Sequence, residues 1–385
     1  MANNLFSKIG RMFDSSASTD AHAGHSESSM DSGNFVDSTS VISSVNLSAT
    51  RAHRFSSVLR ANSVDLKALR DLLWSGCPLS DLAYRSVSWK LVVGYFPSRK
   101  DRFDEVVSRK RGEYIALLPD YSRVSGVLPE SSVDEAASLL RQIRLDIPRT
   151  CFNSVTSFSH SRVQRLMERA LFLLSYRNPA CGYVQGMNDL AIPLLVALLE
   201  EHEKEDIVDI HMESVSESTL QAVEADLYWM MSKLLQDLQE NYIFSQPGIQ
   251  KLNLKLKEIV QRVDPDLSSH LLNEQVELMQ ISFRWFNCLL TREFNIKGIM
   301  RVWDTCIAEE EGFSVFLVYL CAVMLTKLSV EMKKLDFQGI MMLMSKLPFT
   351  SYEVLDIETL LSEAFVLKSL FHSSPNHLVS PSLSN

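Results

Sequence analysis

The sequence predicts an all-α protein, and three observations support that prediction. Apolar residues recur at helical spacing in one segment after another, from about residue 63 to residue 371. No stretch alternates apolar and polar residues between turn residues, which is the pattern of a half-buried strand. No fixed repeat period is visible, so a helical solenoid is not favoured. The length of 385 residues allows two domains of packed helices, or one large domain with tails.

Composition and charge limit the classes of protein that the sequence can represent. Apolar residues make up 46% of the 385 residues and charged residues 22%, as in an ordinary soluble globular protein. The net charge of −9 argues against a protein that binds nucleic acid by neutralising phosphates. The longest apolar run, residues 313–325, falls short of the ~20 residues that a membrane-spanning helix needs and predicts a buried core helix. We expect a soluble, cytoplasmic protein.

The cysteines and the short motifs give no sign of a metal or nucleotide site within the chain. The six cysteines are scattered, without a CxxC pair and without a histidine at metal-ligand spacing. Neither a GxGxxG motif nor a P-loop is present, and no Ser-His-Asp or Cys-His pattern stands out. We expect reduced thiols and no bound metal.

Residues 1–60 are rich in serine, poor in aromatic residues and without sustained periodicity, which predicts a disordered tail. Some apolar residues of this tail share one helical face, namely Leu5, Phe6, Ile9, Met12 and Phe13. This face is compatible with a short helix that binds a membrane surface or a partner, but its short length favours a transient turn. A second flexible tail, rich in Ser, Pro and Asn, is expected at residues 372–385.

Five helices are expected before residue 180, at residues 63–73, 80–93, 98–114, 132–145 and 161–176. Gly94 and Pro97 follow the second, Pro148 the fourth and Pro179 the fifth, as expected of helix ends. The third is dense in charge of both signs. Such a run is typical of a solvated helix face, and the sharper alternative is a basic edge that faces a partner.

The rest of the chain continues as helices. After a helix at residues 189–200, the acidic segment 201–217 is predicted to be an exposed insertion. Further helices are expected at residues 220–238, 249–263, 271–288, 296–308, 313–328, 337–346 and 356–371.

The segment GYVQGMNDL, from Gly182 to Leu190, is the strongest candidate for a functional site. Its glycines allow a backbone to approach a ligand that a side chain would block. The helix that follows presents free N–H groups and a partial positive charge. Gln185 stands at this entrance, where its amide can hold water through a donor and an acceptor. The stretch is suited to handling a polar or anionic group.

Arg149 lies on a loop after a helix end, just as Gln185 lies on a loop beside a helix end, and one amphipathic helix separates them. That helix and its two loops can bring both side chains to one face. An arginine that stabilises charge on phosphate oxygens and a glutamine that positions water suggest phosphoryl chemistry. From these residues alone, a surface arginine and a helix-capping glutamine remain the simpler interpretation.

Three short motifs stand in order along the chain. The segment from Arg85 to Leu91, RSVSWKL, is similar to RxxxWxxL, with its leucine one position early. Residues 143–149 match IxxDxxR and residues 183–187 match YxQGM in every fixed position. In these motifs and their order the sequence resembles the TBC family of GTPase-activating proteins for Rab-type small GTPases, and the likeness covers about residues 72–348. Residues 109–114, 283–286 and 292–294 resemble the Golgi-associated branch of the family.

The resemblance implies a fold of two packed helical lobes over residues 61–371 and a catalytic mechanism that acts on another protein. Arg149 and Gln185 would enter the active site of a GTP-loaded Rab-type GTPase as an arginine finger and a glutamine finger. Asp146 would orient Arg149. Tyr183 and Gly186 of the third motif, together with Asn188 just after it, would support the loop. Arg85 and Trp89 would be structural, with Trp89 packed in the core.

Three further expectations follow from the resemblance. The Mg²⁺ and the GTP would belong to the GTPase, so no cofactor of this chain is expected. The protein would act in vesicle trafficking, in the cytoplasm or peripherally at the Golgi or another endomembrane, recruited by its partner or by its N-terminal segment. The alternative is a non-catalytic scaffold that binds a Rab or other trafficking partners through the same surface.

Overall fold

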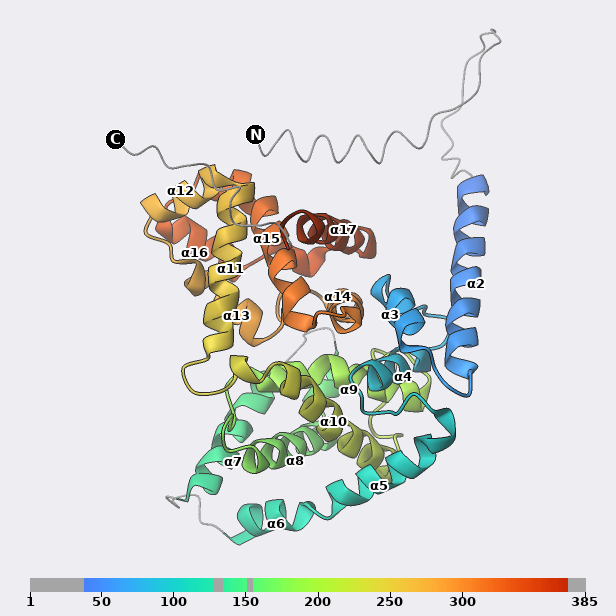
Figure 1. Cartoon of the computed structure of the whole chain (residues 1–385). Coiled ribbons are helices and arrows are strands. Elements are labelled where there is room, and N and C mark those ends of the chain that lie inside the picture. Colours follow the sequence, from blue (N-terminus) through green and yellow to red (C-terminus); the bar gives the residue numbers. More distant parts are fainter. Residues whose placement is uncertain (1–37, 128–133, 151–154, 373–385) are drawn as a thin grey trace, which may run out of the picture.

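The structure is a computed structural model that describes residues 38–127, 134–150 and 155–372 (Figure 1). Over these residues it consists of α-helices and short 3₁₀ turns, with one isolated antiparallel bridge between Ser63 and Arg99 and no strand. The all-α prediction is therefore confirmed. The predicted N-terminal amphipathic face at residues 5–13 and the predicted C-terminal tail from residue 373 lie outside the described residues.

The helices form two lobes, as the resemblance implied. In Figure 1 the lower lobe contains α4 (Ala83–Val92), α5 (Phe103–Ile115), α6 (Leu118–Val127), α7 (Glu135–Asp146), α8 (Ser161–Arg177), α9 (Met187–Glu203) and α10 (Glu217–Asp237). The upper lobe contains α11 (Pro247–Val263), α12 (Pro265–Asn273), α13 (Leu278–Asn287), α14 (Ile296–Ala308), α15 (Phe313–Met332), α16 (Phe337–Ser345) and α17 (Val354–Phe371). On their flank lie α2 (Ser38–Arg60) and α3 (Leu66–Trp74).

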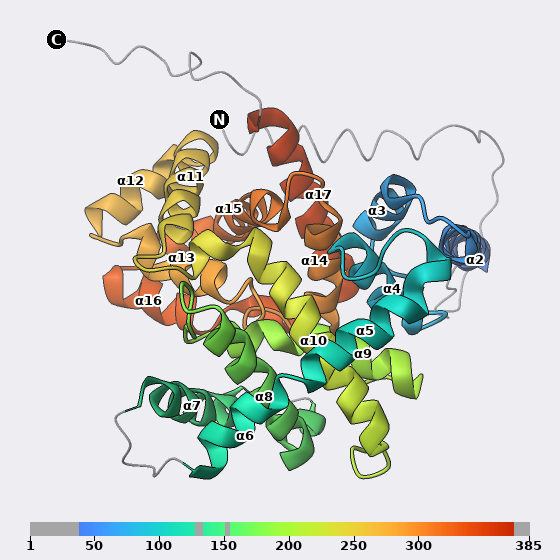
Figure 2. The ribbon, with the colours of Figure 1, turned by 60° about the horizontal axis from the view of Figure 1, so that its bottom comes forward.

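Each lobe is built around one almost fully buried helix. In the lower lobe this helix is α9, which packs against α4, α8 and α10 and also touches α14 of the upper lobe (Figure 2). In the upper lobe it is α15, which packs against α11, α14 and α17. By length and composition α15 is apolar enough to cross a membrane, but most of its apolar window is buried inside the protein. The prediction of a buried core helix there is confirmed.

The prediction of a disordered tail up to residue 60 is wrong at the end of this segment, because the last part of α2 packs against the rest of the protein. Phe55 and Leu59 are buried, and the Phe55 ring stacks on Tyr84 of α4 with centroids 6.3 Å apart. Only a narrow stripe of α2 is apolar, so its stability depends on packing against α3 rather than on local composition. That dependence is invisible in a serine-rich sequence.

The acidic segment 201–217, predicted to be an exposed insertion, is exposed only in part. The side chains of Ile207, Ile210, Met212 and Val215 are buried between the acidic residues. The carboxylate of Glu201 lies 2.5 Å from Lys90 Nζ and takes part in an internal ion pair. The apolar residues anchor this segment to the lower lobe, while most of its charges face the solvent.

The structure departs from the predicted helices at two further places. The single helix predicted at residues 271–288 is two helices, because Gln275 adopts a left-handed φ of 58° and Glu277 with Gln280 forms a capping box that starts α13. The helix α6 was not predicted. It packs against α7 and α8, and the Tyr121 hydroxyl donates to Glu168 Oε1 over 2.7 Å.

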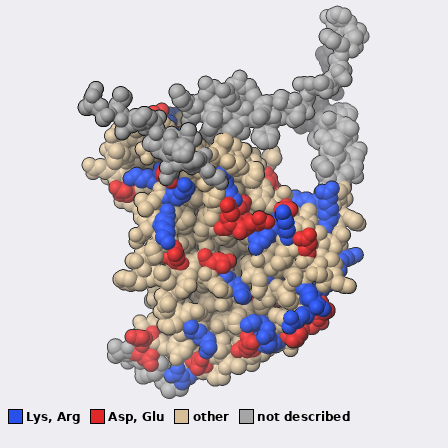
Figure 3. Space-filling model, in the orientation of Figure 1, with Lys and Arg blue, Asp and Glu red and all other residues tan. Residues whose placement is uncertain are grey.

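The charge-dense segment around α5 behaves as a solvated helix face. Arg102 pairs with Glu105 and Lys110 with Glu113, each one helical turn apart. Figure 3 shows basic and acidic side chains mixed along the lower edge where α5 runs in Figure 1. The interpretation as a separate basic edge receives no support from this arrangement.

Candidate functional site

The first motif, around Arg85 and Trp89 on α4, joins the two lobes. Arg85 donates through Nε and Nη2 to the carboxylate of Asp304 on α14, over 3.1 and 3.2 Å. The indole Nε1 of Trp89 donates to the same carboxylate over 2.9 Å. All three side chains are buried. The prediction that Trp89 packs in the core is confirmed. Arg85 is structural, because its Nε and Nη2 donors are both bonded to the Asp304 carboxylate.

Arg149 is placed differently. Beyond α7, Pro148 begins a 3₁₀ turn, Ile147–Arg149, in which Ile147 is buried and Arg149 is exposed. Within the described part of the chain, its guanidinium makes no ion pair. The side chain is therefore available to a group outside the protein.

The loop that carries Gln185 is held at the junction of the lobes. Gly186 has a φ of +108°, which is costly for a residue with a Cβ. A Cβ at this position would also lie 2.3 Å from Asn287 Nδ2. The glycine therefore permits both the turn and the close approach of α13, while the Gln185 side chain stays exposed.

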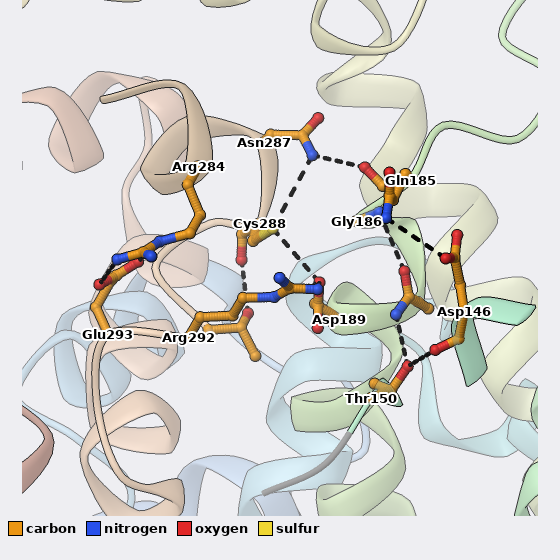
Figure 4. A network of polar contacts seen from close by, with 12 residues as sticks. Asp146, Thr150, Gln185, Gly186, Asp189, Arg284, Asn287, Cys288, Arg292 and Glu293 are labelled. Carbon is orange, nitrogen blue, oxygen red and sulfur yellow. Dashed lines mark hydrogen bonds and ion pairs between the residues drawn. The ribbon is translucent and has the colours of Figure 1, made fainter. Parts of the chain in front are cut away.

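A network of hydrogen bonds joins the Arg149 segment to the Gln185 loop (Figure 4). The Gln185 amide Nε2 lies 3.5 Å from Asp146 Oδ1. The Tyr183 hydroxyl lies 3.1 Å from both Asp146 Oδ2 and Asn188 Oδ1 and has one hydrogen to donate to them. Burial and the nearby Asp146 carboxylate raise the pKa of Tyr183, so the hydroxyl remains a donor.

Asn188 extends this network past Arg149. Its Nδ2 donates to the Thr150 hydroxyl over 2.5 Å, and that hydroxyl donates to the Asp146 carbonyl over 3.0 Å. The Gly186 N–H donates to Asn188 Oδ1 over 3.1 Å. Residues 146 and 150, on both sides of Arg149, are thus bonded to the Gln185 loop. The two predicted side chains emerge from segments that the structure brings together.

The predicted role of Asp146 needs a correction. Over the described residues, no ion pair or hydrogen bond links its carboxylate to Arg149, and its side-chain partners are Tyr183 and Gln185. Asp146 is the last residue of α7 and belongs to the buried face of that helix, so its carboxylate points into the protein, toward the Gln185 loop. In the described residues its carboxylate therefore contacts the glutamine rather than the arginine.

The sequence analysis missed the support that the upper lobe supplies. Asn287, at the end of α13, donates through Nδ2 to the Gln185 carbonyl over 2.8 Å. Its Oδ1 accepts from Gln246 Nε2 over 3.2 Å, and its carbonyl accepts from the Tyr242 hydroxyl over 2.9 Å. Because Asn287 stands 102 residues from Gln185, no local pattern could have assigned it to the site.

The start of α9 is fixed by a second group of side chains, labelled in Figure 4. Arg292 donates to Asp189 Oδ2 from Nε over 2.9 Å, and the Cys288 thiol lies 3.4 Å from the same oxygen. Burial raises the pKa of Asp189, and Arg292 opposes that effect. Burial and the Asp189 charge also raise the pKa of Cys288, so this cysteine stays a neutral thiol. The group holds the helix in place without offering a nucleophile.

The site as a whole presents an exposed arginine and an exposed amide on a rigid frame. Such a pair can contact an anion and orient a water molecule. It contains no activated nucleophile among its described residues. Over the described part of the chain, no group of three His, Cys, Asp or Glu residues is arranged to hold a metal ion.

Comparison with known sequences identifies the family of the chain. The family model described as the Rab-GTPase-TBC domain matches residues 82–333. The TBC1 domain family member 22B of Macaca fascicularis is 40% identical over 329 residues, which cover 85% of this chain and 63% of that protein. The GTPase-activating protein gyp1 of Schizosaccharomyces pombe is 40% identical over 335 residues, covering 86% of this chain and 64% of that protein. The chain therefore spans less than two thirds of the length of these relatives.

Comparison with solved structures agrees. The crystal structure of the Ypt/Rab-GAP domain of Gyp1p has 34% sequence identity and a TM-score of 0.73, covering 84% of this chain and 99% of that domain. A Chlamydomonas flagellar RabGAP TBC domain, with 18% identity and a TM-score of 0.55, shares the fold.

Proposed function

The chain belongs to the Rab-GTPase-TBC domain family, and from this premise we propose that it accelerates GTP hydrolysis by a Rab-type small GTPase through Arg149 and Gln185. The observation that carries the proposal is the network of Asp146, Asn188 and Thr150, which ties the two segments together and leaves both finger side chains exposed. The nucleotide and its Mg²⁺ would be those of the GTPase.

Arg149 would stabilise the charge that develops on the phosphate oxygens during hydrolysis. A guanidinium offers a planar fork of donors that matches these oxygens. An arginine supplied in this way accelerates hydrolysis by ~10³–10⁵-fold. The exposure of Arg149 on a short turn supports the proposal, since a side chain committed to an internal ion pair could not reach a partner.

Gln185 would orient the attacking water. Its backbone carbonyl is held by Asn287 and its amide lies near Asp146, so the loop is positioned before the partner binds. A group fixed in advance loses little entropy in the transition state. By the same premise, we place the activity in vesicle trafficking, at the cytoplasmic face of the Golgi or another endomembrane.

Single-turnover GTP hydrolysis on a panel of GTP-loaded Rab-type GTPases tests this mechanism. The parent protein should accelerate at least one of them. Arg149→Ala should lose about 10³-fold or more of that acceleration. Arg149→Lys should also fail, because an ammonium lacks the planar fork. Gln185→Ala should lose most of it, because the water is no longer oriented.

A matched control is Arg165→Ala, which removes an exposed arginine from the nearby helix α8. This variant should be as active as the parent. If Arg149→Ala and Gln185→Ala are also as active as the parent, the two-finger mechanism is wrong. If the parent binds GTP-loaded GTPase without accelerating hydrolysis, the chain is a scaffold instead.

A further inference from the structure

The turn that connects α10 to α11, residues 242–246, carries the most exposed large apolar side chain in the described part of the chain. Phe244 is 95% exposed, although phenylalanine is ordinarily among the most buried residues. The connection passes from the lower lobe to the upper lobe (Figure 1). It therefore lies at the same junction as the Gln185 loop.

The turn is rigid despite its exposure. The Gln246 N–H donates to the Ile243 carbonyl over 2.9 Å and closes the turn. The Ser245 carbonyl accepts from Gln250 Nε2 over 2.7 Å. On the inner side, Tyr242 is buried and its hydroxyl is bonded to the Asn287 carbonyl. An aromatic side chain at the tip of such a turn is presented in a fixed place.

The backbone of the turn is held in an unfavourable conformation. Ser245 and Gln246 have φ values of 61° and 47°, in the left-handed region that non-glycine residues rarely adopt. Residues kept in such conformations cluster at ligand-binding and functional segments, where the surrounding structure enforces them. Here Gln246 is enforced by its side chain, whose Nε2 donates to the Asn241 carbonyl over 2.9 Å.

One side-chain amide couples this turn to the glutamine finger. Asn287 accepts from Gln246 through Oδ1 and donates to the Gln185 carbonyl through Nδ2. Two hydrogen bonds and the width of one amide group therefore separate the Phe244 turn from the Gln185 loop. A partner that receives Gln185 meets the Phe244 turn beside it.

We propose that Phe244 is an anchor residue that docks into an apolar depression on the GTP-loaded GTPase, next to its nucleotide pocket. This proposal rests on the proposed function. Aromatic side chains on pre-organised surfaces carry a large share of the free energy of association, because they bury a large apolar area at a small entropic cost. The polar finger residues would then act on the reacting groups while Phe244 supplies affinity.

Steady-state stimulation of the most responsive GTPase of the panel, with GTPase concentration varied, tests the anchor. Phe244→Ser should raise KM about tenfold or more and leave kcat within about twofold, because a contact that does not involve the reacting groups contributes equally to the ground and transition states. Phe244→Tyr should restore most of the affinity, because it keeps the ring. Because Phe244 is exposed, neither change should alter the unfolding midpoint appreciably.

The matched control is Leu272→Ser, which removes another exposed apolar side chain from α12, on the side of the upper lobe away from α8 in Figures 1 and 2. Its KM should equal that of the parent. The proposal is overturned if Phe244→Ser has the parent's KM while Arg149→Ala is inactive. It is also overturned if Phe244→Ser only converts a dimer into a monomer without changing KM. If the parent never accelerates hydrolysis, or if both finger variants are fully active, the proposed function itself fails.

Discussion

Two arginines that belong to the sequence motifs of this chain lie in opposite environments. Arg85 is buried between the lobes, where its guanidinium is bonded to Asp304 together with the Trp89 indole. Arg149 is exposed after α7, and its neighbour Asp146 turns toward the Gln185 loop instead. One arginine joins parts of the protein, and the other is left for a partner.

The difference teaches how a rigid frame can present a reactive side chain. The buried Arg85–Asp304 pair fixes α4 against α14, and α9 packs against both helices. The Gln185 loop at the start of α9 therefore sits on a lobe junction that is already fixed. Arg149 can remain without an internal ion partner among the described residues because hydrogen bonds of Asp146 and Thr150 hold its backbone.

Among variants that test the contrast between Arg85 and Arg149, Arg85→Ala is expected to have the largest effect, a loss of stability. The change leaves the fully buried Asp304 carboxylate without its cation, which typically costs about 3–5 kcal/mol. Urea denaturation should show that loss in the free energy of unfolding. Arg149→Ala should leave this free energy within about 0.5 kcal/mol of the parent value, as expected of an exposed side chain. Equal losses in both variants would contradict the assignment of separate roles.

A smaller effect, on kcat, is expected from Asn287→Ala. This variant tests whether the upper lobe helps to hold the exposed site residues in place. The Gln185 carbonyl loses its donor and the finger loop loses its anchor. A displacement of about 1 Å can reduce a rate on the order of 10²-fold, so kcat for GTPase stimulation should fall by roughly 10–100-fold. Asn287→Asp keeps the acceptor for Gln246 but loses the donor, and it should be impaired to a similar degree. Unchanged kcat in both variants would remove Asn287 from the site.

The smallest expected effect is on the pH dependence of stability. It concerns a second buried charge cluster, which includes Lys90 on the same helix as Arg85. Asp226 on α10 accepts from Arg111 over 2.8 Å and lies 3.1 Å from Lys90 of α4. Burial disfavours the charge of Asp226, but the bonds from Arg111 and the charge of Lys90 outweigh burial and lower its pKa. The unfolded chain therefore binds this proton more readily than the folded chain. The stabilisation is present above the ordinary carboxyl pKa of about 3.9 and is lost as pH falls through the lowered value.

Asp226→Asn tests whether the stabilisation by Asp226 is lost as pH falls. The variant should be less stable than the parent at pH 7, by roughly 1–3 kcal/mol. The gap in urea midpoint between the two proteins should narrow as pH falls below about 4. A gap that stays constant from pH 7 to pH 3 would show that the charge of Asp226 contributes nothing.

Residue patterns were sufficient to predict those features that depend on residues close together in the sequence. The helix predicted at residues 296–308 is observed with the same bounds, because its apolar spacing and its Asn295 cap are both local. Arg149 and Gln185 could be predicted as site residues because motif residues and glycine positions are readable along the chain, and the structure leaves both side chains exposed. The break at Gln275 was missed because a left-handed residue that is not glycine or asparagine leaves little trace in sequence.

What local pattern could not predict is which distant residues meet. Asp304 lies 219 residues from Arg85, and Asn287 lies 102 residues from Gln185. The fate of each arginine depends on these meetings, because a guanidinium is structural when a buried carboxylate faces it and available when none does. Local sequence was enough for the all-α class and most of the helices, and it also gave the two residues that we propose as fingers, Arg149 and Gln185. The tertiary structure decided that α2 is ordered, that Asp146 supports the glutamine, and that one asparagine joins Gln185 to Phe244.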